Sequence, residues 1–182
     1  MGLRQRARGG TGVADTVSAI LAVDPGTTAS GYVLLPHTAG APAPLEFGKI
    51  ANADLIDYLI NGLADRHFDC VVCEQIASYG MPVGAEVFST VEWSGRFHQI
   101  VAMHRPATWV YLPRRAVKLE LCDSPRANDA SIRQALADLY GGSKVCKGTK
   151  RSPGPLYGVS GDCWAALGLG VTYLRQNAGE CP

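Results

Sequence analysis

The sequence predicts an α/β domain with a five-stranded mixed sheet, three antiparallel strands followed by parallel ones, flanked by helices. Three observations lead to this prediction. Short apolar runs joined by turn-forming residues open the chain, which is typical of an antiparallel meander. Later apolar runs alternate with segments of helical spacing, which is typical of parallel strands. The last segment is apolar nearly all round, and such a helix is expected to be buried.

The first three strands are expected at residues 18–23, 31–35 and 45–50. The first ends at Asp24-Pro-Gly and the second at Pro36, both of which are turn signals. Residues 53–66 then change period, because Leu55, Leu59 and Leu63 fall on one helical stripe. This segment predicts the first helix.

The second half of the chain predicts strands at 70–76 and 108–112, separated by a long helix over 85–104. A short helix is expected over 114–122 and a clear one over 129–140, with Asn128 or Asp129 as its cap. Residues 141–158 are rich in Gly, Pro and Lys and are interpreted as a loop. The closing helix is expected over 162–176.

Length and composition limit the possible classes of protein. The 182 residues, 47% hydrophobic and 18% charged, suit a single globular domain at 18–178, between a flexible basic tail at 1–17 and a C-terminal tail at 179–182. The net charge of +1 excludes a broadly basic nucleic-acid coat but not a local basic groove. No apolar stretch is long enough for a membrane span, and no export signal is recognised, so a cytoplasmic protein is expected.

Two cysteines at CxxC spacing, Cys70 and Cys73, raise the question of a zinc site. They lie in the expected fourth strand, where residues three apart point to opposite faces of the sheet. No second CxxC accompanies them. We therefore expect buried thiols and no zinc.

Three acidic residues stand at the borders of buried elements. Asp24 ends the first strand, Glu74 ends the fourth, and Asp162 opens the last helix. Each alone is explained by a turn, an ion pair or a helix N-terminus. Together they point to a shared cation, because buried acids need compensation and carboxylates are preferred ligands of Mg²⁺ and Mn²⁺.

The order of these motifs resembles RuvC-type Holliday junction resolvases, which have the ribonuclease-H-like fold. The resemblance covers about residues 19–175 and rests on Ile20-Leu-Ala-Val-Asp24-Pro-Gly-Thr-Thr, Val71-Val-Cys-Glu74-Gln-Ile, Lys118 and Asp162-Cys-Trp-Ala-Ala-Leu. The segments Ser78-Tyr-Gly-Met-Pro-Val-Gly, Trp93-Ser-Gly-Arg-Phe and Gly154-Pro-Leu-Tyr-Gly-Val-Ser-Gly-Asp resemble the phage-encoded branch.

The resemblance implies a homodimer that cuts branched DNA, above all four-way junctions, with two Mg²⁺ or Mn²⁺ ions. Asp24, Glu74 and Asp162 would be the catalytic residues and metal ligands, with Asp24 between the ions. The sequence departs from the family at two positions. Ala165 stands where cellular enzymes carry a second helix acid, and Ala77 where they carry an aromatic residue. Asp129 replaces a common Lys and is interpreted as a helix cap.

Contacts to DNA are expected from one aromatic residue that substitutes for the missing one and from two groups of cations near the proposed site. Phosphate contacts of this kind give affinity without sequence information. The candidates are Tyr79, Arg114, Arg115, Lys118, Lys144, Lys147, Lys150 and Arg151.

Three other readings remain open. A non-catalytic module that binds branched DNA is consistent with the missing acid at Ala165. A nuclease of the same fold that acts on RNA or on simple flaps is not separable by sequence. Asp24-Pro-Gly-Thr-Thr also resembles the phosphate-binding turn of actin-like and sugar kinases, but this chain is too short for their second domain.

Overall fold

The computed structural model describes residues 18–78, 80, 82–104 and 106–177, and the two terminal tails expected from the sequence lie outside them. Its sheet has five strands in the order β3-β2-β1-β4-β5. Strands β1 (Ala19–Asp24), β2 (Ala29–Pro36) and β3 (Glu46–Ala51) are antiparallel, whereas β4 (Cys70–Gln75) and β5 (Thr108–Pro113) run parallel to β1. The predicted mixed sheet is therefore confirmed.

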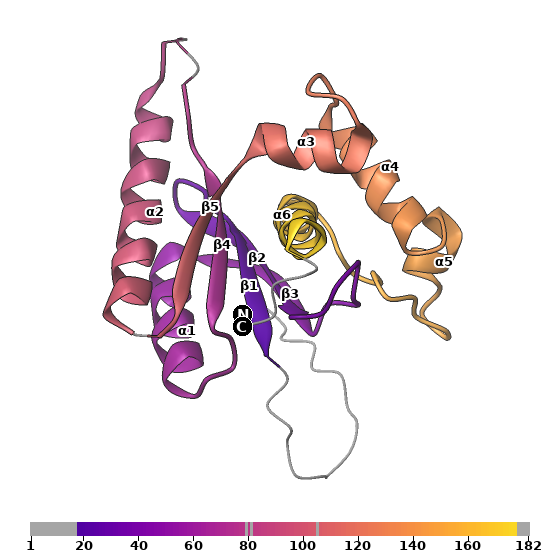
Figure 1. The fold of residues 1–182 in the computed structure, drawn as a ribbon, viewed down its shortest axis with the longest axis horizontal. Helices are drawn as coiled ribbons and strands as arrows, with labels where there is room; N and C mark the ends of the chain where they lie inside the picture. The colour runs from indigo at the N-terminus through magenta and orange to yellow at the C-terminus, as the bar shows by residue number, and fades with distance from the viewer. Residues whose placement is uncertain (1–17, 79, 81, 105, 178–182) are drawn as a thin grey trace.

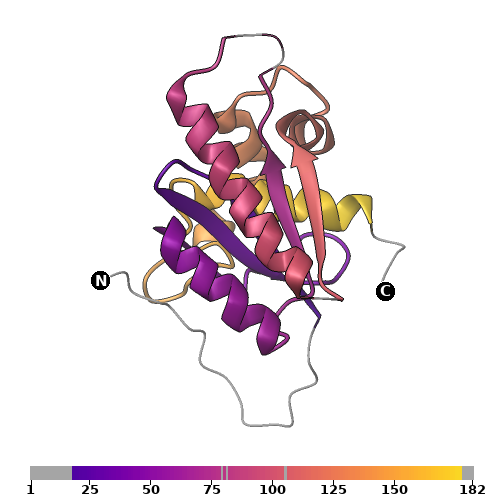
Figure 2. The ribbon, with the colours of Figure 1, turned by 90° about the vertical axis from the view of Figure 1, so that its left-hand side faces the viewer.

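Helices α1 (Asn52–Ala64) and α2 (Ala85–Met103) cover one face of the sheet, in front of the strands in Figure 2. Their apolar stripes pack against alternate residues of the central strands, which point to this face. The buried cluster includes Leu21, Val23, Leu55, Leu59 and Phe97. Phe97 is fully buried.

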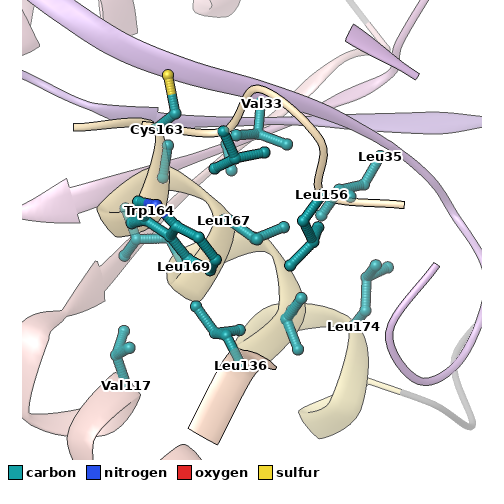
Figure 3. Close-up of a cluster of buried hydrophobic side chains, with 14 of the residues drawn as sticks. Val33, Leu35, Val117, Leu136, Leu156, Cys163, Trp164, Leu167, Leu169 and Leu174 are labelled. Carbon is teal, nitrogen blue, oxygen red and sulfur yellow. The ribbon is translucent and has the colours of Figure 1, made fainter. Parts of the chain in front are cut away.

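Helix α6 (Cys163–Gln176) crosses the other face, with α3 (Arg114–Cys122) and α4 (Asp129–Leu139) outside it (Figure 1). Leu167, Leu169 and Leu174 of α6 lie in the larger core cluster, shown in Figure 3. A Cβ at Gly170 would lie 2.5 Å from Leu35 and 3.1 Å from Ala22, so glycine lets α6 lie close to the sheet. The expectation of a buried last helix is confirmed.

The structure differs from the sequence prediction at two places around α4. The segment 141–158, interpreted as a loop, contains the short helix α5 (Ser143–Lys147), because Cys146 is apolar and buried. The N-cap of α4 is Asn128, whose side chain accepts a hydrogen bond from the amide of Ser131 at 2.9 Å. Asp129 is therefore not the cap.

The two CxxC thiols point to opposite faces, as expected. Cys70 belongs to the cluster beneath α6, whereas the sulfur of Cys73 lies 3.6 Å from the hydroxyl of Ser94 on α2. Within the described ranges, none of the helices is long and apolar enough to cross a membrane.

Candidate functional site

Strand register brings the first two acids together. Asp24 pairs with Gly31 of β2, and Gly31 pairs in turn with Lys49 of β3. On the other side of β1, Val23 pairs with Cys73, so Glu74 lies beside Asp24 on the parallel strand β4. Paired residues point to the same face, which here is the face covered by α6. The acids thus continue the alternation that places Ala22 and Val72 in the core beneath α6.

The turn after Asp24 is held by buried polar groups rather than by the Asp24 side chain. Ser30 Oγ accepts from the Gly26 amide at 3.3 Å and donates to Asn52 Oδ1 at 2.7 Å. Asn52 Nδ2 donates back to the Gly26 carbonyl at 2.9 Å. A Cβ at Gly26 would lie 2.3 Å from the Ala29 carbonyl oxygen, so only glycine fits. This network fixes the end of β1 and hence Asp24.

Asp162 reaches the same place from the start of α6. A Cβ at Gly31 would lie 2.8 Å from the Cβ of Asp162, so the missing side chain at position 31 is the space that Asp162 uses. The Asp162 carboxylate makes no side-chain cap bond to α6 and instead forms an ion pair of 2.6 Å with Lys49 Nζ. The helix-cap explanation of Asp162 is thus wrong.

The three predicted acids, Asp24, Glu74 and Asp162, line one pocket of about 300 Å³. Its wall carries the carboxylates of Asp24, Glu74 and Asp162 together with Asp129 of α4. Ala165 also lines the pocket, so the position at which cellular RuvC-type enzymes carry a second helix acid does face the site. Asp129 brings a fourth carboxylate to the pocket from a different helix.

The pocket wall also carries two cations, Arg114 and Arg133. Arg114 follows directly after β5 and donates to Glu74 Oε2 at 3.2 Å and to Asp129 Oδ1. The bond from Arg114 lowers the pKa of Asp129. Arg114 therefore links the end of β4 to the start of α4, and it was predicted only as a DNA contact.

The electrostatics of the pocket are those of crowded acids. The pKa of Asp24 is raised to about 7, first by burial and then by the charges of Glu74 and Asp162, while the charge of Arg114 opposes the rise. A carboxyl that holds its proton near neutral pH is one that a nearby cation would stabilise as the anion.

This donor set fits a hard divalent cation such as Mg²⁺ or Mn²⁺, because it offers carboxylate oxygens and mutual repulsion that a cation would relieve. In their present rotamers, however, no three His, Cys, Asp or Glu side chains among the described residues are grouped as a metal site. Lys49 and Arg114 instead neutralise Asp162 and Glu74.

The expected DNA-contacting cations fall into separate places. Arg114 lies in the pocket, while Arg115 is exposed and Lys118 half-buried on α3. The other four are exposed: Lys144 and Lys147 on α5, and Lys150 and Arg151 in the turn that the Gly148–Pro153 bridge closes. Tyr79 lies outside the described residues.

Sequence reasoning missed Lys49, Arg133 and the pocket role of Asp129. Lys49 lies in a strand that was predicted without its register against the neighbouring strand, so its pairing with Gly31 could not be foreseen. Arg133 follows Asp129 by four residues, a spacing that puts both on one helix face. That spacing was a usable signal.

No protein-family model matches the chain, and no curated protein sequence does. Solved structures do. RuvC of Thermus thermophilus aligns with a TM-score of 0.63 and 15% identity, over 88% of this chain and 96% of that one. RuvC of T. thermophilus in complex with a Holliday junction substrate aligns with a TM-score of 0.63 and 16% identity, over 88% and 97%. The chain therefore has a RuvC-like fold of the ribonuclease-H-like type.

Proposed function

We propose that this protein is a divalent-metal-dependent endonuclease that cuts branched DNA, with the four-way junction as its main substrate. The observation that carries the proposal is the convergence of Asp24, Glu74 and Asp162, from two strands and a helix, on one pocket of a RuvC-like fold. Acids this far apart in sequence have no structural need to meet. A similar structure, that of T. thermophilus RuvC, is in complex with a Holliday junction substrate.

In the proposed reaction, Asp24, Glu74 and Asp162 would hold the divalent metal in the pocket. Bound divalent ions supply an activated water and stabilise the leaving oxygen. Asp24 stands between the other two acids along the sheet and is assigned the shared position. The buried network of Gly26, Ser30 and Asn52 keeps it there.

The cations outside the pocket are assigned to the DNA backbone. Arg115 and Lys118 on α3 lie beside the pocket residue Arg114 in sequence, and Lys144, Lys147, Lys150 and Arg151 form an exposed basic segment. Such contacts supply affinity and register but no sequence preference. Tyr79 keeps its proposed role at the junction. This activity belongs in the cytoplasm, as expected from the sequence.

A homodimer is part of the proposal, because a two-fold dimer matches a two-fold junction. Exposed apolar side chains on the outer side of α2 and on the edge strand β5 support it: Phe88, Val91 and Tyr111. Gly95 follows Val91 by about one turn of α2, with open space where a Cβ would stand. We expect Phe88→Ser to shift the molar mass in light scattering from dimer toward monomer.

The deciding experiment is cleavage of a labelled four-way junction with Mg²⁺, Mn²⁺ or EDTA, with linear duplex as the substrate control. We expect paired nicks that need metal and disappear in Asp24→Asn. Binding to the junction without metal should persist in this variant, because it keeps all the cations assigned to the DNA backbone. Cleavage by Asp24→Asn at the wild-type rate would exclude the proposed site.

A second candidate is a non-catalytic module that binds branched DNA. It is favoured by one observation: Lys49 and Arg114 already neutralise two of the acids, Asp162 and Glu74. Tight junction binding without cleavage in any metal would establish this function instead.

A further inference from the structure

The acidic pocket is neutralised by its own chain. Lys49 Nζ lies 2.6 Å from Asp162 Oδ2, and Arg114 lies 3.2 Å from Glu74 Oε2 while also binding Asp129. Each of these two cations therefore takes a carboxylate that the proposed function assigns to the metal. An oxygen lone pair that accepts from an N–H is not free to coordinate an ion.

We propose that Lys49 and Arg114 are internal counterions which a divalent ion must displace from Asp162 and Glu74, so that these two ion pairs set the affinity for metal. The inference rests on the proposed function, because it requires these carboxylates to be the ligands. Metal binding is then an exchange of one cation for another rather than entry into an open site.

The position of Lys49 is dictated by the sheet. Gly31 separates Lys49 from Asp24 in one row across three strands, and its missing side chain leaves the space in which Asp162 lies. The lysine ammonium therefore meets Asp162 over a glycine, at the rim of the pocket. The ion pair thus depends on the register of β2 and β3 and on the glycine at position 31.

The two counterions differ in what happens when they are displaced. The Lys49 side chain is 55% exposed, so its ammonium can turn into water at little cost. The Arg114 side chain is 29% exposed and its second partner is Asp129. Arg114 can release Glu74 and keep Asp129, so a half-buried guanidinium is never left without an anion. Asp129 thus serves as a positioning residue that holds Arg114 during the exchange.

The test uses the full-length protein without DNA and the variant Lys49→Met, which keeps the aliphatic stem and removes the charge. Binding of Mn²⁺ and Mg²⁺ is measured by calorimetry, and melting is followed in EDTA. We expect the metal affinity to rise by about two- to fivefold, the factor that corresponds to one exposed ion pair. The melting temperature in EDTA should fall.

Arg175→Met is the matched control. It removes the same net charge and breaks an ion pair of 2.8 Å with Glu120, away from the acidic pocket. Its melting temperature should fall as well, while its metal affinity stays that of the wild type. An equal rise in metal affinity in both variants would mean that total charge, and not Lys49, sets the affinity, and would overturn the proposal.

The part played by Arg114 is tested with Asp129→Asn, alone and together with Arg114→Met. Alone, Asp129→Asn should weaken metal binding, because Arg114 then holds Glu74 more firmly. With Arg114 already replaced, the same change should have no effect. Weakening of equal size in both backgrounds would make Asp129 a direct ligand and refute its action through Arg114.

The two proposals fail in different ways. If the wild type binds metal and Lys49→Met binds it no more tightly, the counterion inference is wrong and the nuclease proposal stands. If the wild type binds no metal but Lys49→Met does, the exchange is supported in its strongest form. If neither binds metal, both proposals are wrong.

Discussion

The acidic pocket and the basic segment (Lys144, Lys147, Lys150 and Arg151) carry opposite charges and are built in opposite ways. In the pocket, the acids are fixed by two strands and a helix, and Lys49 and Arg114 of the same chain neutralise two of them. In the basic segment, all four cations are exposed on a short helix and a turn. None of the four forms an ion pair within the part of the chain that the structure describes.

The difference teaches that the fold places charge for two separate purposes. Catalysis needs reacting groups held to within a fraction of an ångström, and in the pocket buried polar groups and glycines fix the positions of the acidic side chains. Attraction to a phosphate backbone needs charge near the surface but little geometry. Substitutions in the two regions should therefore affect different measurements.

The largest effect is expected in the pocket, from Glu74→Gln. Loss of one carboxylate ligand removes several kcal/mol of stabilisation of the transition state, which lowers single-turnover cleavage by about a thousandfold. Junction affinity, measured by fluorescence anisotropy in EDTA, should stay within about threefold of the wild type. A matching loss of affinity would place Glu74 in DNA binding and blur the distinction between the two regions.

The basic segment should show the reverse pattern. Replacement of all four of its cations by Gln is expected to lower junction affinity by about tenfold or more at low salt, and to reduce the slope of log affinity against log salt by up to about 0.9 for each lost contact. Cleavage at saturating protein should be unchanged. An unchanged salt slope would show that the segment does not touch DNA.

Substitutions in the two regions should also differ in their effect on the unfolding free energy. Arg114→Gln leaves Glu74, whose side chain is 12% exposed, without its cation, and we expect a loss of about 1–3 kcal/mol in unfolding free energy. Lys144→Gln should change it by less than about 0.5 kcal/mol. Urea denaturation in EDTA measures the unfolding free energy of both variants. Equal losses would contradict the view that ion pairs fix the pocket but not the basic segment.

A last comparison concerns stability as a function of pH in the absence of metal. The pKa of Asp24 rises from 3.8 to about 7 on folding, so the folded chain holds this proton more tightly. Its contribution to stability is complete below pH 3.8 and is lost as the pH rises through about 7. Asp24→Asn should lack this loss and melt above the wild type at pH 8 in EDTA. A parallel pH dependence in both proteins would assign it to other groups.

Much of the fold was accessible from the sequence because its signals are local. The strands ending at Asp24 and Glu74 and the helix after Asp162 were predicted close to their observed bounds. Helix α5 was not, because its five residues lie among glycines and lysines and only Cys146 anchors it. Short helices owe their stability to tertiary contacts, which a local pattern does not contain.

The site was accessible only in part for a similar reason. The convergence of the three acids could be predicted, because each stands at the end of a strand or the start of a helix. The cations that pair with these acids could not be predicted. Lys49 meets Asp162 through a strand register and a glycine, and Arg114 at the start of α3 meets Asp129 at the start of α4. Pairings of this kind depend on distances between elements, which no spacing along the chain encodes.

Gly31 has a consequence for protein engineering. A methyl group at this position would stand 2.8 Å from the Cβ of Asp162 and 2.9 Å from its carbonyl oxygen, and it would push the start of α6 away from the sheet. Gly31→Ala therefore offers a purely steric off-switch that changes no charge anywhere in the molecule. A variant disabled in this way would keep the surface potential of the active protein, which makes it a better decoy for trapping DNA than one from which an acid has been removed.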